Sequence, residues 1–158
     1  MHLLGRWQSG FEAEFVALGR SLGLNPRACI FSYPPCHPEK IPGIAASFDV
    51  GLALELPVSR NREICLSNKI FTYLLAGICI VASESEGQKR FFENLPQVGF
   101  TFPCGNVDAL TAALANLLGD RELLNQLSMQ SEKQGREKYN WTVEGRKLLE
   151  FIDKQVLS

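Results

Sequence analysis

Five consecutive apolar residues, Ile78-Cys79-Ile80-Val81-Ala82, constrain the fold of this chain more than any other feature of its sequence. A strand that is apolar on both faces has to be covered on both faces, which is typical of a central strand in a parallel sheet. Helices are predicted on either side of this run, one from an N-capping Ser67 to Ala76 and one over residues 86–94. The sequence therefore predicts an α/β fold, in which helices flank a parallel sheet.

Further strands and helices alternate along the rest of the chain. A capping box, S-x-x-E, begins at Ser9 and predicts a helix over 10–22 with one buried apolar stripe. Asn106 and Thr142 are predicted N-caps of two later helices, and roughly the last 50 residues are expected to be helical. The remaining expectations are strands at 3–4, 28–31, 50–54 and 98–102, a short helix within 38–47, a polar loop at 55–65 and a long helix at 121–138.

The length and composition fit one globular domain, which we expect to span residues 1–158. A chain of 158 residues is within the usual size of a domain, and 46% hydrophobic residues are enough for a core. The net charge of −1 results from 16 basic and 17 acidic residues. This balance gives no support for a nucleic-acid-binding surface or a polybasic membrane patch, so we expect no nucleic-acid partner.

The five cysteines and two histidines form no recognisable metal or disulfide pattern. The cysteines are widely and irregularly spaced, no C-x-x-C pair occurs, and His2 is far from His37 in the sequence. We therefore expect reduced thiols in a cytoplasmic protein, with no metal site. No apolar signal segment and no run of 18 apolar residues is found, so neither export by a standard signal nor a transmembrane segment is expected.

Loops at the carboxyl ends of the strands are where an open parallel sheet binds its ligands. Two of these loops run into helix starts, whose free N–H groups and partial positive charge suit phosphate. Ser67-Asn68-Lys69 combines a hydroxyl, an amide and an ammonium group, and Ser85-Glu86-Gly87-Gln88 includes a glycine that allows close backbone approach. This pattern is compatible with a diphosphate cradle, although the spacing alone favours ordinary helix capping with solvated Lys and Arg side chains. The four loops are Gly5–Ser9, Ser32–His37, Glu55–Ser67 and Ser83–Gln88.

Several familiar motifs are absent from the sequence. It contains neither G-x-G-x-x-G nor G-x-x-x-x-G-K-[ST], which mark dinucleotide and P-loop sites. It also lacks the G-x-S-x-G turn of serine hydrolases, and a catalytic histidine is not indicated. An NAD-dependent enzyme and a hydrolase are therefore disfavoured.

Two segments carry the most specific pattern in the chain, D-V-G-L-A-L-E at 49–55 and L-S-N-K-I-F-T-Y-L-L-A-G-I-C-I-V-A-S at 66–83. They are followed by Gly87-Gln88, a strand at 98–102, N-V-D-A-L at 106–110 and Y-N-W at 139–141. In order and spacing these segments resemble the C-terminal domain of GT-B glycosyltransferases, and more narrowly the group 1 (family 4) retaining enzymes. The resemblance covers nearly the whole chain and implies a Rossmann-like domain that binds a nucleotide-activated sugar.

The resemblance implies a role for three of the four loops. The loop after the strand at 28–31 would hold the base of the donor, and the helix that opens at Ser67 would meet its diphosphate. The loop over 83–88 would lie close to the sugar and the distal phosphate. No metal or other cofactor is implied, since the nucleoside-diphosphate sugar is itself the donor substrate. The implied donor-binding residues are Ser32, Tyr33, Pro34, Ser67, Asn68, Lys69, Thr72, Ser85, Gly87 and Gln88.

The sequence departs from the family pattern in three respects. The family's first βα unit, whose basic residues help to neutralise the diphosphate, and its whole acceptor domain are not found. Thr72 replaces the second glutamate of an E-x7-E pair, which receives the ribose hydroxyls in the family. Because hydrogen bonds to charged groups are worth ~1.5–3 kcal/mol and neutral ones ~0.5–1.5, this replacement would lower donor affinity roughly tenfold. The first glutamate falls at Ile64, and the adjacent Glu63 is the catalytic candidate if the loop shifts by one residue.

Two functions stay open at this stage. The first is a donor-binding domain for retaining glycosyl transfer, present as a fragment or as one half of a split enzyme whose acceptor domain is on a separate chain. The alternative is a catalytically inactive Rossmann-like module that associates with another protein or forms a homodimer through an exposed sheet edge. A cytoplasmic location, with or without peripheral membrane association, fits both. The base, the sugar and the acceptor do not follow from the sequence.

Overall fold

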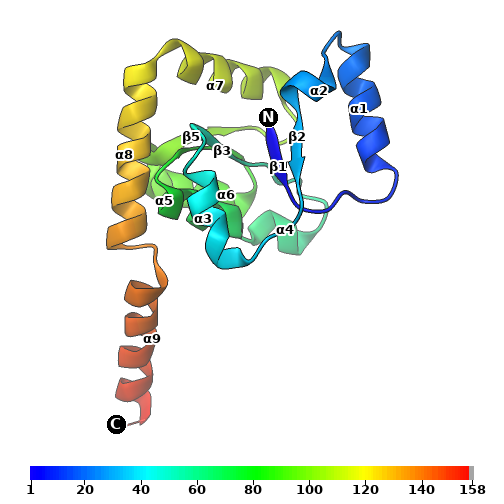
Figure 1. Ribbon diagram of the computed structural model, residues 1–158. Helices are drawn as coiled ribbons and strands as arrows, with labels where there is room; N and C mark the ends of the chain where they lie inside the picture. The colour runs from blue at the N-terminus through cyan, green and yellow to red at the C-terminus, as the bar shows by residue number, and fades with distance from the viewer. Residues whose placement is uncertain (157–158) are drawn as a thin grey trace. The chain divides into compact units, whose positions relative to one another are not determined.

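The computed structural model describes residues 1–156, which form two compact units, Met1–Lys40 and a second unit that begins at Ile41 (Figure 1). Each unit has its own parallel sheet, two-stranded in the first and three-stranded in the second. The predicted α/β class, with parallel strands flanked by helices, is therefore confirmed.

The first unit pairs β1 (His2–Leu4) in parallel with β2 (Phe31–Tyr33). Between the strands lie α1 (Phe11–Ser21) and α2 (Pro26–Cys29), and the 3-10 turn η1 (Pro38–Lys40) ends the unit. The strand predicted at 28–31 is therefore displaced toward the C-terminus. Pro26 stands at the first position of α2, where its fixed φ favours a helical turn, and the chain becomes extended only after that turn.

Two expectations for α1 are wrong in detail. Its N-cap is Gly10, with φ 81°, and no side chain caps the helix, so Ser9 does not form the predicted capping box. The left-handed conformation at this position favours glycine over serine. The apolar stripe is largely exposed, with Phe11 47%, Leu18 56% and Leu22 69% exposed. Periodicity predicted the helix correctly but not the burial of its face.

The second unit is built on three parallel strands in the order β3 (Val50–Ala53), β4 (Cys79–Ser83) and β5 (Gly99–Phe102). β4 is the central strand and pairs with both neighbours. All five of its residues are buried, as the continuous apolar run predicted.

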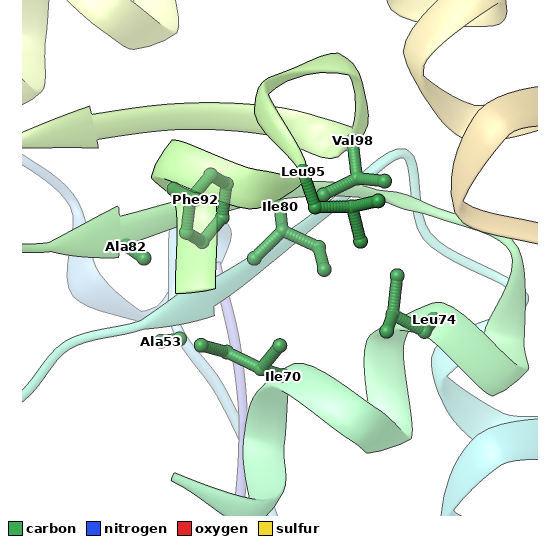
Figure 2. Packing of buried hydrophobic residues seen from close by; sticks show 8 residues of the cluster. All are labelled: Ala53, Ile70, Leu74, Ile80, Ala82, Phe92, Leu95 and Val98. Atoms are coloured by element: carbon green, nitrogen blue, oxygen red, sulfur yellow. The ribbon is translucent and has the colours of Figure 1, made fainter. Parts of the chain in front are cut away.

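Alternate residues of β4 divide the core into two clusters, one on each face of the sheet. On one face, Ile80 and Ala82 pack with Ile70 and Leu74, and Figure 2 shows these two α5 side chains directed toward the middle of the cluster, where Ile80 lies. The other face carries a second cluster. This two-sided burial is the reason why β4 contains no polar residue before Ser83. The second cluster is Cys79, Val81, Phe102, Leu117, Leu124 and Leu127.

Most helices of the second unit begin and end where the sequence predicted. Ser67, Ser85 and Asn106 each cap a helix through a side-chain hydrogen bond. At the last helix the cap is Asn140 instead of Thr142, because the Asn140 Oδ1 accepts a hydrogen bond from the Val143 N–H at 3.0 Å. The helices and turns are α3 (Ile41–Ala45), α4 (Arg60–Ile64), α5 (Asn68–Ala76), α6 (Glu86–Asn94), η2 (Pro96–Val98), α7 (Val107–Gly119), α8 (Arg121–Glu137) and α9 (Trp141–Val156).

The C-terminal part of the chain is helical, as expected, through α7, α8 and α9. Helix α9 continues beyond α8 and away from the sheet of this unit (Figure 1). The segment at 55–65, predicted as a polar loop, contains the short helix α4, which Ser59 caps by accepting from the Arg62 N–H. The short helix predicted within 38–47 corresponds to η1 and α3.

Candidate functional site

The carboxyl ends of β3 and β4 lie side by side, because Ala53 pairs with Ala82. Just beyond them, Ser83 joins the two ends through its hydroxyl group. The Ser83 Oγ donates to the Glu55 carbonyl oxygen and accepts from the Glu55 N–H, each at 2.7 Å. Ser83 is 2% exposed, so this link is shielded from water. The loop that leads to α5 therefore starts from a fixed point at the sheet edge.

The Glu55 carboxylate is the most enclosed of the paired acidic groups in the described part of the chain, with a side chain 15% exposed. It forms an ion pair with the Lys69 ammonium group and lies 3.7 Å from the Arg62 guanidinium. Burial raises the pKa of Glu55, but the hydrogen bond and charge of Lys69, the Ser67 hydroxyl and the charge of Arg62 together hold it below its ordinary value. The cations thus outweigh the cost of desolvation.

The N-terminal end of α5 presents the groups that the sequence singled out. The Ser67 hydroxyl accepts from the Lys69 N–H at 3.3 Å, and Asn68 is exposed at the first turn. The Thr72 hydroxyl is half-buried and donates to the Asn68 carbonyl oxygen at 3.1 Å, one turn earlier in the helix. Thr72 is therefore hydrogen-bonded to its own helix.

A cavity of about 220 Å³ lies at this end of α5. It is smaller than the ~300–1,000 Å³ of most small-molecule sites, so it suits a part of a ligand such as a phosphate pair. One cation, Arg62, and one carboxylate, Glu55, line this hollow together with the first residues of α5, while Lys69 pairs with Glu55 from the helix turn behind it. Its lining residues are Glu55, Asn61, Arg62, Cys65, Leu66, Ser67 and Asn68.

The first turn of α6 packs against the neighbouring loop. A Cβ atom at Gly87 would lie 2.5 Å from the Ile64 carbonyl oxygen. The glycine therefore allows the backbone at Ile64 to pack closely against α6, in the place where the sequence predicted the approach of a ligand. Ser85 is 1% exposed and caps the helix by accepting from the Gln88 N–H at 3.4 Å. Both residues therefore position α6 against the segment that precedes α5.

Gln88 is fully buried and connects α6 to the same sheet edge. Its Nε2 donates to the Ser83 Oγ at 3.4 Å, while its Oε1 has no hydrogen-bond partner within residues 1–156. The Ser83 hydroxyl thus accepts from both Glu55 and Gln88 and donates once, which completes its hydrogen-bonding capacity. Through Ser83, Gln88 stabilises the position of Glu55.

Glu63 belongs to α4 and is paired on the surface. Its Oε2 accepts from the Arg60 Nη1 at 2.9 Å, and the same Nη1 lies 3.0 Å from the Glu86 Oε2. The side chain of Glu63 is 43% exposed. Glu63 is not one of the residues that line the cavity, and its predicted catalytic role stays a prediction.

Ser32, Tyr33 and Pro34 belong to the first unit, and all three are exposed. Ser32 and Tyr33 lie in β2 and not in the predicted loop. The Ser32 Oγ accepts from the Trp7 indole N–H at 2.9 Å, and the Tyr33 hydroxyl lies 3.0 Å from the His2 Nδ1. The predicted role of these residues toward a base stays a prediction.

Three residues of the site were not singled out from the sequence, namely Glu55, Arg62 and Ser83. Each stands in or next to a loop that was predicted to bind ligands because it follows a strand. The position of the loop therefore pointed to these residues, and their residue types did not. A charged residue directly after a predicted strand, as Glu55 is after 50–54, could have drawn attention. Its pairing with Lys69, fourteen residues later, needs the folded chain.

This site is suited to binding an anion next to a carboxylate. No group of three or more potential metal-binding side chains occurs within residues 1–156. Over the same residues, no helix combines the length and the apolar character needed to span a bilayer.

No protein-family model and no curated protein matches the sequence. Solved structures do match it, over nearly its whole length. Anabaena HepE in complex with UDP has a TM-score of 0.75 at 16% identity, over 97% of this chain. The sucrose-phosphate synthase of Thermosynechococcus elongatus has a TM-score of 0.73 at 15% identity, over 98%. WaaG, a glycosyltransferase involved in lipopolysaccharide biosynthesis, has a TM-score of 0.69 at 13% identity, over 92%.

All three proteins are GT-B glycosyltransferases, so the chain has a GT-B glycosyltransferase fold. It spans 40% of HepE, 38% of the synthase and 36% of WaaG. This share agrees with the C-terminal half that the sequence pattern indicated. At these identities the likeness concerns the fold alone.

Proposed function

We propose that this chain, with its GT-B glycosyltransferase fold, is the donor-binding domain of a glycosyltransferase and binds a nucleoside-diphosphate sugar. The observation that carries the proposal is the cationic start of α5, where Ser67, Lys69 and Arg62 meet at the carboxyl edge of β3 and β4. Structural neighbours support it, since HepE was solved with UDP and with UDP-glucose.

The diphosphate is the part of the ligand that this site suits best. Helix N–H groups and the ammonium group of Lys69 would compensate its negative charge, and Ser67 and Asn68 offer a hydroxyl and an amide. In glycosyl transfer the diphosphate is also the leaving group, so the same groups would stabilise the charge that develops when the bond to the sugar breaks. We propose transfer with retention of configuration, in keeping with the resemblance of the sequence.

Other parts of the donor are assigned by the same proposal. The α6 start, with Ser85, Gly87 and Gln88, is assigned to the sugar and the distal phosphate; because the Ser85 and Gln88 side chains are buried, the contact is proposed to be made by the backbone of this turn. Ser32, Tyr33 and Pro34 are proposed for the base. Thr72 is the residue proposed nearest the ribose, and its neutral hydroxyl is a weaker acceptor than the carboxylate of a glutamate would be.

The acceptor is proposed to bind to an acceptor domain on a separate chain, and a homodimer of this chain belongs to the alternative in which it is an inactive association module. The exposed apolar residues of α9 agree with association, since Trp141 is 80% exposed and Phe151 is 61% exposed. The location is proposed to be cytoplasmic, with peripheral membrane association as an option, and no metal is expected to take part.

Calorimetric titration of the purified chain with UDP, ADP, GDP and CDP tests the proposal. We expect saturable binding of one nucleotide, with UDP the first to try because HepE binds it. Lys69→Ala should weaken that binding about tenfold, since a charge-assisted hydrogen bond is lost.

Lys147→Ala is the matched control, because it removes one ammonium group that pairs with Glu144 within α9. It should leave the affinity unchanged. A folded chain that takes up none of the four nucleotides at millimolar concentration would contradict a donor site in this chain.

A further inference from the structure

We propose that Glu55 is an internal competitor of the donor, whose carboxylate holds Lys69 in the ligand-free chain and has to give it up when a diphosphate binds. The inference rests on the proposed function. It states that Glu55 determines how tightly the site binds the diphosphate of the donor. Glu55 is thus an affinity-determining residue and not a catalytic one.

The backbone of Glu55 is held in place at the cavity wall. The Ser83 hydroxyl binds both its N–H and its carbonyl oxygen at 2.7 Å, and the Cys104 thiol lies 3.7 Å from the same carbonyl. The buried Gln88 in turn donates to Ser83. With the main chain fixed at this point, the carboxylate and the Lys69 ammonium group can separate only through rotation of their side chains.

The groups that Glu55 occupies are those that a diphosphate would need. Lys69 donates to its Oε1, Arg62 lies 3.7 Å from its Oε2, and the Ser67 hydroxyl helps to lower its pKa. All four residues belong to one small hollow or to the helix turn behind it. One carboxylate therefore pairs with both cations at the start of α5.

Two anions compete for the same cations in such an arrangement. A bound diphosphate has to replace the Glu55 carboxylate at Lys69 or to tolerate its negative charge at short range, and either effect lowers affinity. The pair is partly exposed, since the Lys69 side chain is 49% exposed, so screening by water limits the effect. We expect removal of the Glu55 charge to raise affinity about three- to tenfold.

Titration of the wild-type chain and Glu55→Gln with UDP and with inorganic pyrophosphate tests the inference. Glutamine keeps the size of the side chain and removes only the charge. We expect Glu55→Gln to bind both ligands at least threefold more tightly than wild type. Glu144→Gln is the matched control, because it removes one carboxylate that pairs with Lys147 on α9 and should leave both affinities unchanged.

Equal or weaker binding by Glu55→Gln, with normal binding by the wild type, would overturn the inference and leave the proposed function intact. Absence of binding by both folded proteins would instead overturn the proposed function, and the inference with it. The two failures are therefore distinguishable.

A measurement on the wild-type chain covers the case in which Glu55→Gln does not fold. Carbon-13 NMR of labelled glutamate follows the ionisation of Glu55 with and without saturating pyrophosphate. If the diphosphate takes Lys69 away, the pKa of Glu55 rises, because its strongest favourable partner is lost and a second anion lies near. A pKa that stays the same or falls on saturation would overturn the inference.

Discussion

At the scale of single residues, the site depends on contacts between groups that are distant in the sequence. Glu55 and Lys69 stand fourteen positions apart, and Ser83 reaches Glu55 across twenty-eight. The sequence pointed to Lys69 through the helix start and to Ser83 only as the beginning of a loop. What joins them is the parallel register of β3 and β4, which brings both strand ends to one edge.

The cysteines give a residue-scale prediction, because two of them differ strongly in environment. Burial raises the pKa of the Cys79 thiol to about 12, whereas Cys65 is exposed at the cavity. At pH 8 only on the order of one Cys79 thiol in 10⁴ is ionised, and the thiolate is the reactive form. Mass spectrometry after brief treatment with iodoacetamide should therefore find Cys65 labelled and Cys79 unlabelled.

Unfolding in urea before the treatment is the control, since it should make both cysteines react. Rapid labelling of Cys79 in the folded chain would mean that β4 is not buried on both faces. Labelling of Cys65 should also become slower in the presence of a ligand that fills the cavity.

At the scale of elements, the packing of α5 against α8 depends on a glycine. A Cβ atom at Gly135 of α8 would lie 2.5 Å from the carbonyl oxygen of Leu74 on α5, and backbone atoms cannot give way as a side-chain tip can. Gly135→Ala should therefore lower the free energy of unfolding by about 1–3 kcal/mol, as overpacking does in other cores. Urea unfolding measures the change.

Gly145→Ala in α9 is the matched control for this substitution. The nearest atoms to a Cβ at Gly145 belong to Trp141 at 3.8 Å, an ordinary contact. Because alanine is the better helix former, this variant should gain up to about 1 kcal/mol. Equal effects of the two substitutions would show that the α5–α8 contact is looser than described.

At the scale of the whole molecule, the buried hydrophobic core belongs to one unit. Apart from Pro26, every buried apolar side chain of the described chain lies at Ala45 or beyond, in the unit that begins at Ile41, while the strand β2 of the first unit is exposed throughout. Burial of apolar surface is the main source of stability. We therefore expect the 41–158 fragment to fold by itself and the 1–40 fragment not to.

Circular dichroism and urea unfolding of the two separate fragments check this expectation. Cooperative unfolding of 41–158, with helix content retained, would agree with it. If instead 41–158 unfolded without cooperativity, the first unit would be needed for the stability of the second.

Local patterns in the sequence determined most of the second unit. The continuous apolar run predicted β4 as a central buried strand, and Ser67, Ser85 and Asn106 marked the starts of three helices, because strand burial and helix capping act between near neighbours in the sequence. In the first unit the same reasoning found α1 but misjudged its cap and the burial of its stripe, since periodicity does not tell what covers a face. The cap of the last helix was predicted at Thr142 and is Asn140. Both residue types are common N-caps, so the sequence alone did not distinguish the two positions.

The tertiary structure alone decided how the candidate site is composed. The sequence indicated that an anion could bind at the start of α5, and it supplied Ser67, Asn68 and Lys69. That Glu55 already neutralises Lys69, that Gly87 approaches the backbone at Ile64, and that Thr72 bonds to its own helix became visible only in the folded chain. The physical reason is that charge pairing and close packing depend on distances in space. For residues far apart in the sequence, these distances are set only when the strands pair in their register.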